Sequence, residues 1–279
     1  MFENPENKVD IVLLPEATER ANKVLNLHKI DMDGFSDLYS PDVIATDRKY
    51  LAEREQQIGD LFAEQAGEHR LEAEHTLELA TIFHAIVVNN SSWFGPVMGT
   101  KVYATTRYDD VKHGVDAIVE RVTTEGTSLL GLGIDVTFGK QVDRKIRKLK
   151  EHIDNGSLTK VKYFKSGLKS VIDEITQLPS VVVGATADTA RELTNLFAKG
   201  KDNELGDHQV QFQVLEQILM QCEYFAKYAR DQNKESLAIP YDNAIKFIRT
   251  AYALNKKLVA AGDKGVRDQF FDDMKRVLI

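Results

Sequence analysis

The stretch GVDAIVERVTTEGTSLLGLGIDVTFGK, residues 114–140, constrains the fold more than any other part of the chain. It holds two apolar segments joined by the turn-forming residues TTEG, a pattern that predicts two antiparallel strands of one sheet. Each segment carries one aspartate, Asp116 at the start of the first and Asp135 near the end of the second. These two ends lie side by side in an antiparallel hairpin, so we expect the two carboxylates to be neighbours.

Two interpretations of this pair of aspartates are open. Two carboxylates at short range repel each other unless a cation or a shared proton lies between them. Carboxylate oxygens are typical ligands of Mg²⁺ and Mn²⁺, so the pair could hold such an ion. The alternative is that each aspartate caps a turn or pairs with a nearby lysine or arginine.

The patterns on either side of the hairpin predict a protein that contains both helices and strands (α/β, of the α+β type). We expect a mixed central sheet that is flanked by helices. A helical pattern over residues 47–88 precedes the strand-like KVYATTR, and the polar YDDVKHG indicates a loop. After the hairpin come an amphipathic helix, KQVDRKIRKLKEHIDNG, and the strand-like segments LTKVKYFKS and LPSVVVGA. We expect an N-terminal extension over 1–46, an α/β core over 47–204, and a helical C-terminal region over 205–279 packed on that core.

The composition indicates a cytoplasmic globular protein. The sequence of 279 residues contains no apolar run of the roughly 20 residues that a membrane span needs. The first residues also lack the pattern of a signal peptide. The single cysteine, Cys222, excludes an internal disulfide and a cysteine zinc cluster. Because the net charge is −7, binding of nucleic acid would require a local basic patch.

The most basic stretch directly follows the hairpin. Arg144, Lys145 and Lys148 lie in the predicted amphipathic helix, and Lys162 lies in the next strand. Such a patch suits contacts with phosphate groups, although runs of charge also occur on helix faces that meet only solvent. We predict that Arg144, Lys148 and Lys162 bind nucleic acid.

The order helix, three strands, helix, strand over about residues 47–200 resembles the restriction-endonuclease-like core of the PD-(D/E)XK nuclease superfamily. In that superfamily an acid lies on the second core strand, and the third carries a second acid, any residue, and a lysine. GVD ending at Asp116 and the run Asp135-Val136-Thr137 match these positions. The resemblance implies that Asp116 and Asp135 are catalytic and hold Mg²⁺ or Mn²⁺, with the backbone carbonyl of Val136 completing the metal shell.

The sequence departs from the superfamily at one position, because Thr137 stands where the lysine is expected. Thr137 cannot supply the positive charge that orients water and stabilises the phosphate. Lys140 or Lys145, at the start of the following helix, could reach the site in its place. The alternative is that catalysis has been lost while the fold is kept.

Other candidates come from the helical region and from the predicted loop. In related nucleases a glutamate of the first helix often joins the metal site, which makes Glu55 a further metal-ligand candidate, unless its head lies in water. Asp109 and Asp110 could be ligands, but we favour a turn role for both. His84 shows no metal-ligand spacing to another histidine.

A second resemblance, to a group of bacterial proteins found mostly in uncultured lineages, spans most of residues 100–230 and implies no activity. The shared motifs are Tyr108-Asp109-Asp110, Gly114-Val115-Asp116, Asp135-Val136-Thr137-Phe138, Lys162-Tyr163-Phe164-Lys165-Ser166, Leu178-Pro179, Val181-Val182-Val183-Gly184, and His208 with Gln211.

Two functions therefore compete. The first is a metal-dependent nuclease that hydrolyses phosphodiester bonds of DNA or RNA. The second is a non-catalytic binding or scaffold protein with a nuclease-like fold, whose C-terminal helices bind a protein partner or form a homodimer.

Overall fold

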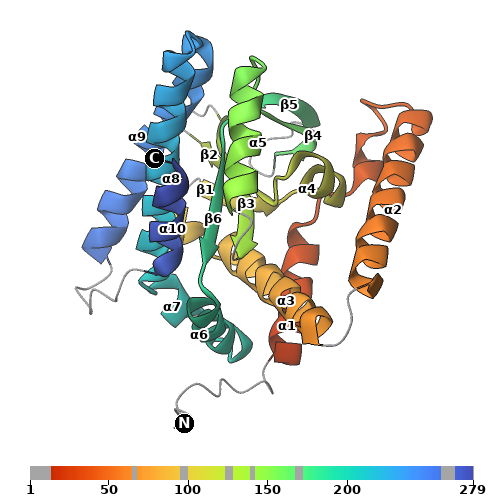
Figure 1. Ribbon diagram of the computed structural model, residues 1–279, viewed down its shortest axis with the longest axis vertical. Helices are drawn as coiled ribbons and strands as arrows, with labels where there is room; N and C mark the ends of the chain where they lie inside the picture. Colours follow the sequence, from red (N-terminus) through yellow and green to blue (C-terminus); the bar gives the residue numbers. More distant parts are fainter. Residues whose placement is uncertain are drawn as a thin grey trace.

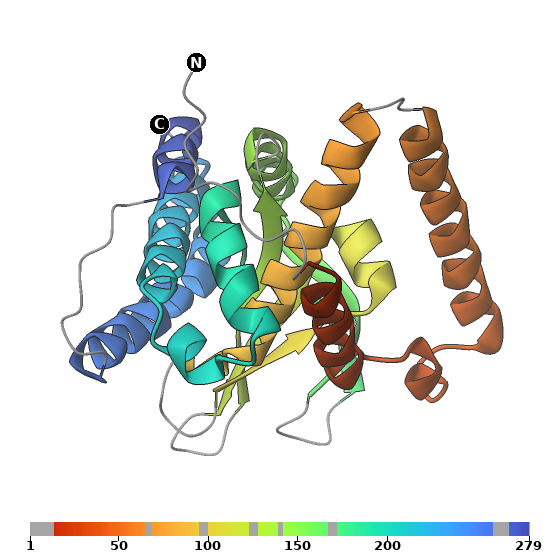
Figure 2. The same ribbon diagram turned by 90° about the horizontal axis from the view of Figure 1, so that it is seen from below.

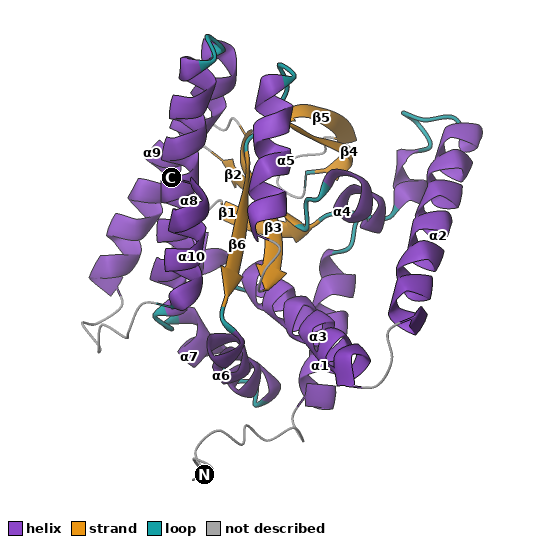
Figure 3. Cartoon of the chain, in the orientation of Figure 1, coloured by secondary structure: helices purple, strands orange, loops and turns teal. Residues whose placement is uncertain are grey.

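The computed structural model describes residues 14–64, 68–94, 100–122, 128–138, 142–166, 172–258 and 268–278. These residues form a mixed α+β protein in which many helices surround a small sheet (Figure 3). The predicted mixed central sheet flanked by helices is therefore confirmed. Lys140 lies outside the described residues.

The central sheet contains four strands, and a separate sheet contains two. In spatial order the central strands are β1 (Thr100–Ala104), β2 (Ala117–Val122), β3 (Ser128–Phe138) and β6 (Ser180–Ala185). β2 is antiparallel to both of its neighbours, whereas β6 is parallel to β3. The second sheet pairs β4 (Thr159–Lys165) with β5 (Ile172–Leu178). The sequence does not predict β5, because this strand is mostly polar and only partly buried.

The helices gather in two groups on either side of the central sheet (Figures 1 and 2). The N-terminal group is α1 (Leu14–His28), α2 (Pro41–Glu64) and α3 (Glu68–Asn89), and the C-terminal group is α8 (Val210–Asp231), α9 (Glu235–Leu258) and α10 (Gln269–Leu278). Between them lie α4 (Arg107–His113), α5 (Val142–Asp154), α6 (Ala187–Ala198) and α7 (Asp202–Gly206), and the short 3-10 helices are η3 (Met32–Phe35) and η4 (Ser91–Phe94). α2 stands at the outer edge of the molecule (Figure 1).

The register of β2 and β3 brings the two predicted aspartates together. Ala117 opposes Ile134, and the N–H of Asp116 donates to the carbonyl oxygen of Ile134 at 2.8 Å. Asp116 therefore lies opposite Asp135, at the start of one strand and near the end of the other. This part of the hairpin prediction is confirmed.

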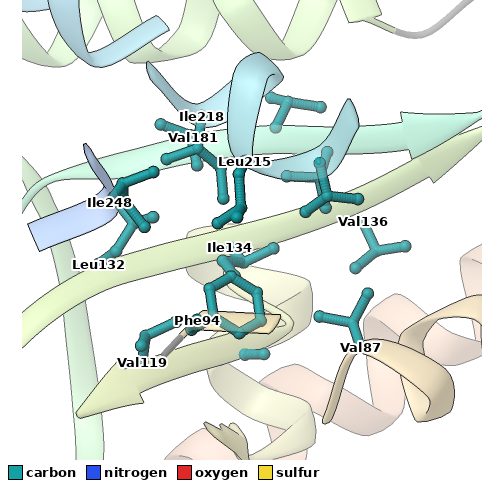
Figure 4. Packing of buried hydrophobic residues seen from close by; sticks show 14 of the residues in the cluster. Val87, Phe94, Val119, Leu132, Ile134, Val136, Val181, Leu215, Ile218 and Ile248 are labelled. Atoms are coloured by element: carbon teal, nitrogen blue, oxygen red, sulfur yellow. The ribbon is translucent and has the colours of Figure 1, made fainter. Parts of the chain in front are cut away.

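The two faces of β3 have different neighbours, because successive side chains alternate between faces. Leu132, Ile134 and Val136 point into the main hydrophobic core, where they meet Phe94 of η4 and Val87 of α3 (Figure 4). Asp135 and Thr137 face the opposite side, which α5 covers. The apolar face thus anchors the strand, and the other face is left for polar side chains.

The predicted polar loop over YDDVKHG is wrong, because these residues form most of α4. The hydroxyl of Thr106 accepts a hydrogen bond from the N–H of Asp109 at 3.1 Å and caps the start of the helix. Gly114 ends it with a left-handed φ of 71°, a conformation that favours glycine. α4 therefore leads directly into β2 and holds its acids in fixed positions.

One hydrophobic cluster contains residues from all three predicted regions, among them Ala17, Ile134 and Leu215. The division of the chain at residues 46 and 204 stays a prediction. Among the described residues, no helix has both the length and the apolar character needed to cross a membrane.

Two glutamines of α8 protect the open edge of β6. The amide of Gln221 accepts from the N–H of Val182 at 2.8 Å and donates to its carbonyl oxygen at 2.6 Å. Gln217 binds the N–H and carbonyl of Gly184 in the same way, at 3.0 and 2.9 Å. Gln217 and Gln221 are four residues apart on a helix, and Val182 and Gly184 are two residues apart on a strand. Both separations are about 6 Å, so the two side-chain amides match the spacing of the strand and continue its hydrogen-bond pattern. They close an edge on which another strand could pair.

We expect Gln221→Ala to lower the free energy of unfolding by about 3 kcal/mol, because it leaves the buried N–H and carbonyl of Val182 without partners. Urea denaturation followed by circular dichroism measures this change. The matched control is Gln232→Ala at the exposed end of α8, which should cost less than about 0.5 kcal/mol. Equal losses in the two variants would contradict the edge-capping role.

Candidate functional site

The site lies where β2 begins and β3 ends, on the face of the sheet that α5 covers. Asp116 accepts a hydrogen bond from the N–H of Val136 at 2.6 Å. Lys145 forms an ion pair with Asp135 and donates to the carbonyl oxygen of Val136 at 3.1 Å. Two acids from adjoining strands and one lysine from a helix thus meet around the backbone of Val136.

The amphipathic pattern of α5 explains how Lys145 reaches the strands. Val142, Ile146, Leu149 and Ile153 are buried and hold the helix against the core. Lys145 precedes Ile146 and extends along this buried stripe toward the sheet, and its side chain is only 20% exposed. The side chain of Asp135 is 16% exposed, so the ion pair is largely shielded from water.

A third carboxylate, Asp110 of α4, joins the two predicted ones. It shares a hydrogen bond with Asp116 and forms an ion pair with Arg107. The turn role that we favoured for Asp110 is therefore incomplete. Asp109 does have a structural role, because its buried carboxylate accepts from the backbone N–H groups of Lys162 at 2.7 Å and Tyr163 at 3.1 Å.

Glu55 does not reach the acids. It pairs with Arg107 at 3.0 Å, its side chain is 47% exposed, and Arg107 lies between it and Asp110. The prediction of Glu55 as a metal ligand is not supported by this position. That prediction assumed that the stripe of α2 that carries Glu55 faces the core. Ile58 lies on the same stripe and is 38% exposed, so the stripe does not face the core. Of the two helices α2 and α3, it is α3 that packs on the central sheet.

Crowding of the acids changes their protonation. Burial, and then the charge of Asp135, raises the pKa of Asp116 to about 6. Burial, and then the charge of Asp116, raises the pKa of Asp110 to about 7. Burial also raises the pKa of Asp135, although Lys145 acts against the shift. Near neutral pH, Asp110 and Asp116 therefore titrate as a coupled pair that shares a proton.

His84 of α3 completes the surroundings of the site and is missed by the sequence interpretation. Its ring hydrogen-bonds the backbone of Asp116 and interacts with Asp110, and burial lowers its pKa to about 4. Its Nε2 is buried and has no hydrogen-bond partner in the described part of the chain. A neutral imidazole with a free nitrogen is a ligand for a metal ion. The available signal is a lone histidine inside the apolar run TIFHAIVV.

The predicted nucleic-acid-binding residues fall into two places. Arg144 and Lys148 lie on the exposed part of α5, and the Nζ of Lys148 is 3.3 Å from the carbonyl oxygen of His113. Lys162 instead forms a shielded ion pair with Asp47 of α2. Its Nζ also lies among the rings of three tyrosines, Tyr39, Tyr108 and Tyr163, at 4.8, 5.7 and 5.5 Å from their centroids. Lys162 therefore makes structural contacts, and its predicted role in binding nucleic acid stays a prediction.

The donor set fits a hard divalent cation in its chemistry. Within the described residues, no group of three or more histidine, cysteine, aspartate or glutamate side chains is arranged to hold a metal ion. The carboxylates are already bound to groups of the chain. Asp135 pairs with Lys145, and Asp116 hydrogen-bonds Asp110 and the N–H of Val136. The oxygens nevertheless belong to two crowded carboxylates and one backbone carbonyl. The ring of His84 hydrogen-bonds the backbone of Asp116, and its Nε2 has no partner among the described residues.

Comparison with known proteins identifies no relative. No protein-family model, no curated protein and no solved structure matches this chain. The function is therefore inferred from the residues and geometry of the site.

We expect Asp116→Asn to stabilise the metal-free protein at high pH. An aspartate whose pKa is raised on folding binds more protons in the folded chain between about pH 4, where it titrates in the unfolded chain, and its folded pKa of about 6. Stability is therefore lost as the pH rises through this window. The amide of the variant has no charge to bury, so the variant should gain about 1–2 kcal/mol near pH 8 and much less near pH 4.

Denaturation in urea and EDTA across this pH range measures the difference. The control is Asp143→Asn on the exposed side of α5, which should show no such pH dependence. A constant difference between Asp116→Asn and the wild type at all pH values would contradict the crowding of the acids.

Proposed function

We propose that this protein is a metal-dependent nuclease that hydrolyses phosphodiester bonds of DNA or RNA. The observation that carries the proposal is the meeting of Asp116, Asp135 and Lys145 around the backbone of Val136. An acid pair on adjoining strands with a lysine beside it is the arrangement that the PD-(D/E)XK resemblance implies. Cytoplasmic location is part of the same proposal.

The sheet supports a restriction-endonuclease-like core. Three consecutive antiparallel strands are followed by α5 and then by β6, which is parallel to β3. This is the strand–helix–strand order of the resemblance, with β4 and β5 inserted before the last strand. The helix that precedes β1 is α3, and it supplies His84 instead of the expected Glu55.

Mg²⁺ or Mn²⁺ would be held by Asp116, Asp135, the carbonyl of Val136 and the Nε2 of His84. The ion supplies a bound water of lowered pKa and polarises the phosphate. The chain itself supplies the placement of these donors, because Asp116 is fixed by the Val136 N–H and His84 is fixed by the backbone of Asp116.

Lys145 takes the role of the lysine missing at position 137. Its ammonium group already lies at Asp135 and the Val136 carbonyl, where a positive charge would stabilise negative charge on a phosphate. In the free protein the same group balances the charge of Asp135. Lys145 would therefore compete with a metal ion for Asp135, and its ammonium group would be available to a phosphate where a metal occupies the site.

A non-catalytic scaffold is the second candidate, and one observation favours it. Lys145 forms a shielded ion pair with Asp135, so the chain itself supplies a partner for the charge of this acid. In that case the C-terminal helices would carry the function by binding a protein partner or a second copy of the chain.

Titration of the purified protein with Mn²⁺ by calorimetry separates the two candidates. We expect binding by the wild type and none by the double variant Asp116→Asn, Asp135→Asn, because both carboxylates are required as ligands. Asp143→Asn should bind as the wild type does, since this exposed residue pairs with Arg147 away from the site. No binding by the wild type at millimolar Mn²⁺ would exclude the nuclease and favour the scaffold.

Lys145→Met distinguishes a catalytic lysine from a structural one. Removing the competing ammonium should tighten Mn²⁺ binding several-fold, while cleavage of labelled DNA or RNA should fall at least about 100-fold. Arg147→Met, which lies on the exposed side of the same helix, should change neither quantity. Unchanged cleavage, or weaker Mn²⁺ binding, would show that Lys145 does not have the proposed role.

A further inference from the structure

The basic residues of α5 are directed to different sides of the helix. Lys145 pairs with Asp135, Arg147 pairs with Asp143 at 2.6 Å, and the Nζ of Lys150 lies 4.9 Å from the ring centroid of Tyr224. These contacts belong to the site, to the solvent side and to the packing against α8. The residues at positions 144, 148 and 152 follow one another at four-residue intervals and form a separate stripe.

The stripe, defined by Arg144, Lys148 and His152, runs outward from the acid site beside α4. Arg144 and Lys148 are exposed, and His152 is partly exposed. The Nζ of Lys148 lies 3.3 Å from the carbonyl oxygen of His113, at the end of α4. It also interacts with Asp135, so the stripe begins directly at the site.

Lysine and histidine side chains from neighbouring elements gather around the same place. His113 lies within electrostatic range of Lys112, Lys148, His152 and Lys160, which come from α4, α5 and β4. Lys160 is paired with Glu174 at 2.7 Å, and Glu151 interacts with Lys148 and His152. The lysines carry the positive charge of this group, because burial and nearby lysines lower the pKa of His113 and His152. In a chain of net charge −7, a local group of lysines is suited to a polyanion.

We propose that the Arg144–Lys148–His152 stripe binds the sugar-phosphate backbone of a single-stranded nucleic acid and leads it to the acid site. The proposal rests on the proposed nuclease function and names its substrate class. Side chains four residues apart on a helix are separated by about 6 Å along the axis, which is comparable with the spacing of phosphates along an extended strand. Each member of the stripe can therefore meet a successive phosphate.

The recess of the acids favours a single strand over a duplex. Asp135 and Lys145 are largely buried, and the end of α4 lies close above them. A Cβ at Gly114 would lie 3.3 Å from the Nζ of Lys148 and 3.7 Å from a carboxylate oxygen of Asp135. A flexible single strand can turn one phosphate toward a recessed site, whereas a duplex holds its phosphates on a wide rigid surface.

Fluorescence anisotropy tests the proposal with labelled oligonucleotides of about 20 nucleotides, as single-stranded DNA, single-stranded RNA and duplex DNA, in EDTA. The test variant is Arg144→Glu with Lys148→Glu, and the matched control is Arg147→Glu on the same helix. We expect the double variant to bind single strands at least ten-fold more weakly, with a salt dependence reduced by about 1.4 for two lost phosphate contacts. The control should bind as the wild type does.

Tighter binding of either single strand than of the duplex supports the proposal, and the tighter of DNA and RNA identifies the substrate. Equal affinities of the double variant and the control, or a duplex bound as tightly as the single strands, would overturn it. Because EDTA removes any metal and prevents cleavage, this result is independent of the calorimetric test. A nuclease whose strand runs elsewhere would bind Mn²⁺ through Asp116 and Asp135 and still fail here.

Discussion

The register of β2 against β3 is the constraint on which the rest of the site depends. A slip of one residue would turn Asp135 toward the apolar face and Ile134 toward α5. The hydrophobic core prevents this slip, because Leu132, Ile134 and Val136 all point into the main cluster, where they meet Val87 and Phe94. The positions of the charged groups are thus fixed by apolar burial on the opposite face of the same strand, and neither property can change alone.

The acids create an electrostatic cost that the surrounding helices offset. Burial and mutual repulsion disfavour the ionised forms of Asp110, Asp116 and Asp135. Each acid has its own partner, and the three partners come from α4, β3 and α5. α4 supplies Arg107, α5 supplies Lys145, and the backbone N–H of Val136 binds Asp116. The repulsion between the acids is thus offset by a shared proton and by two basic side chains of α4 and α5.

The sequence predicts the parts of this arrangement that depend on local pattern, and misses those that depend on distant contacts. The hairpin, its two acids and the amphipathic α5 follow from periodicities of two and about 3.6 residues. α4 also has a local signal, the Thr106–Asp109 capping pair, but its polar composition obscured it. The position of His84 beside Asp116, and the pairing of Lys162 with Asp47 across 115 positions, follow only from tertiary packing. Periodicity likewise could not decide whether α2 or α3 lies on the sheet.

The packing of α10 explains why the positive charge comes from a helix. Thr137 is the register partner of Gly184 on β6, so the two positions share a face of the sheet. Phe270 of α10 lies so close to Gly184 that a side chain there would collide with its ring, and Thr137 is only 5% exposed. A lysine at position 137 would have to extend into this apolar contact. Lys145 avoids it by approaching from α5, and the same helix then carries the basic stripe. By filling the space beside position 137, α10 thereby leaves α5 as the element that supplies the positive charge beside Asp135.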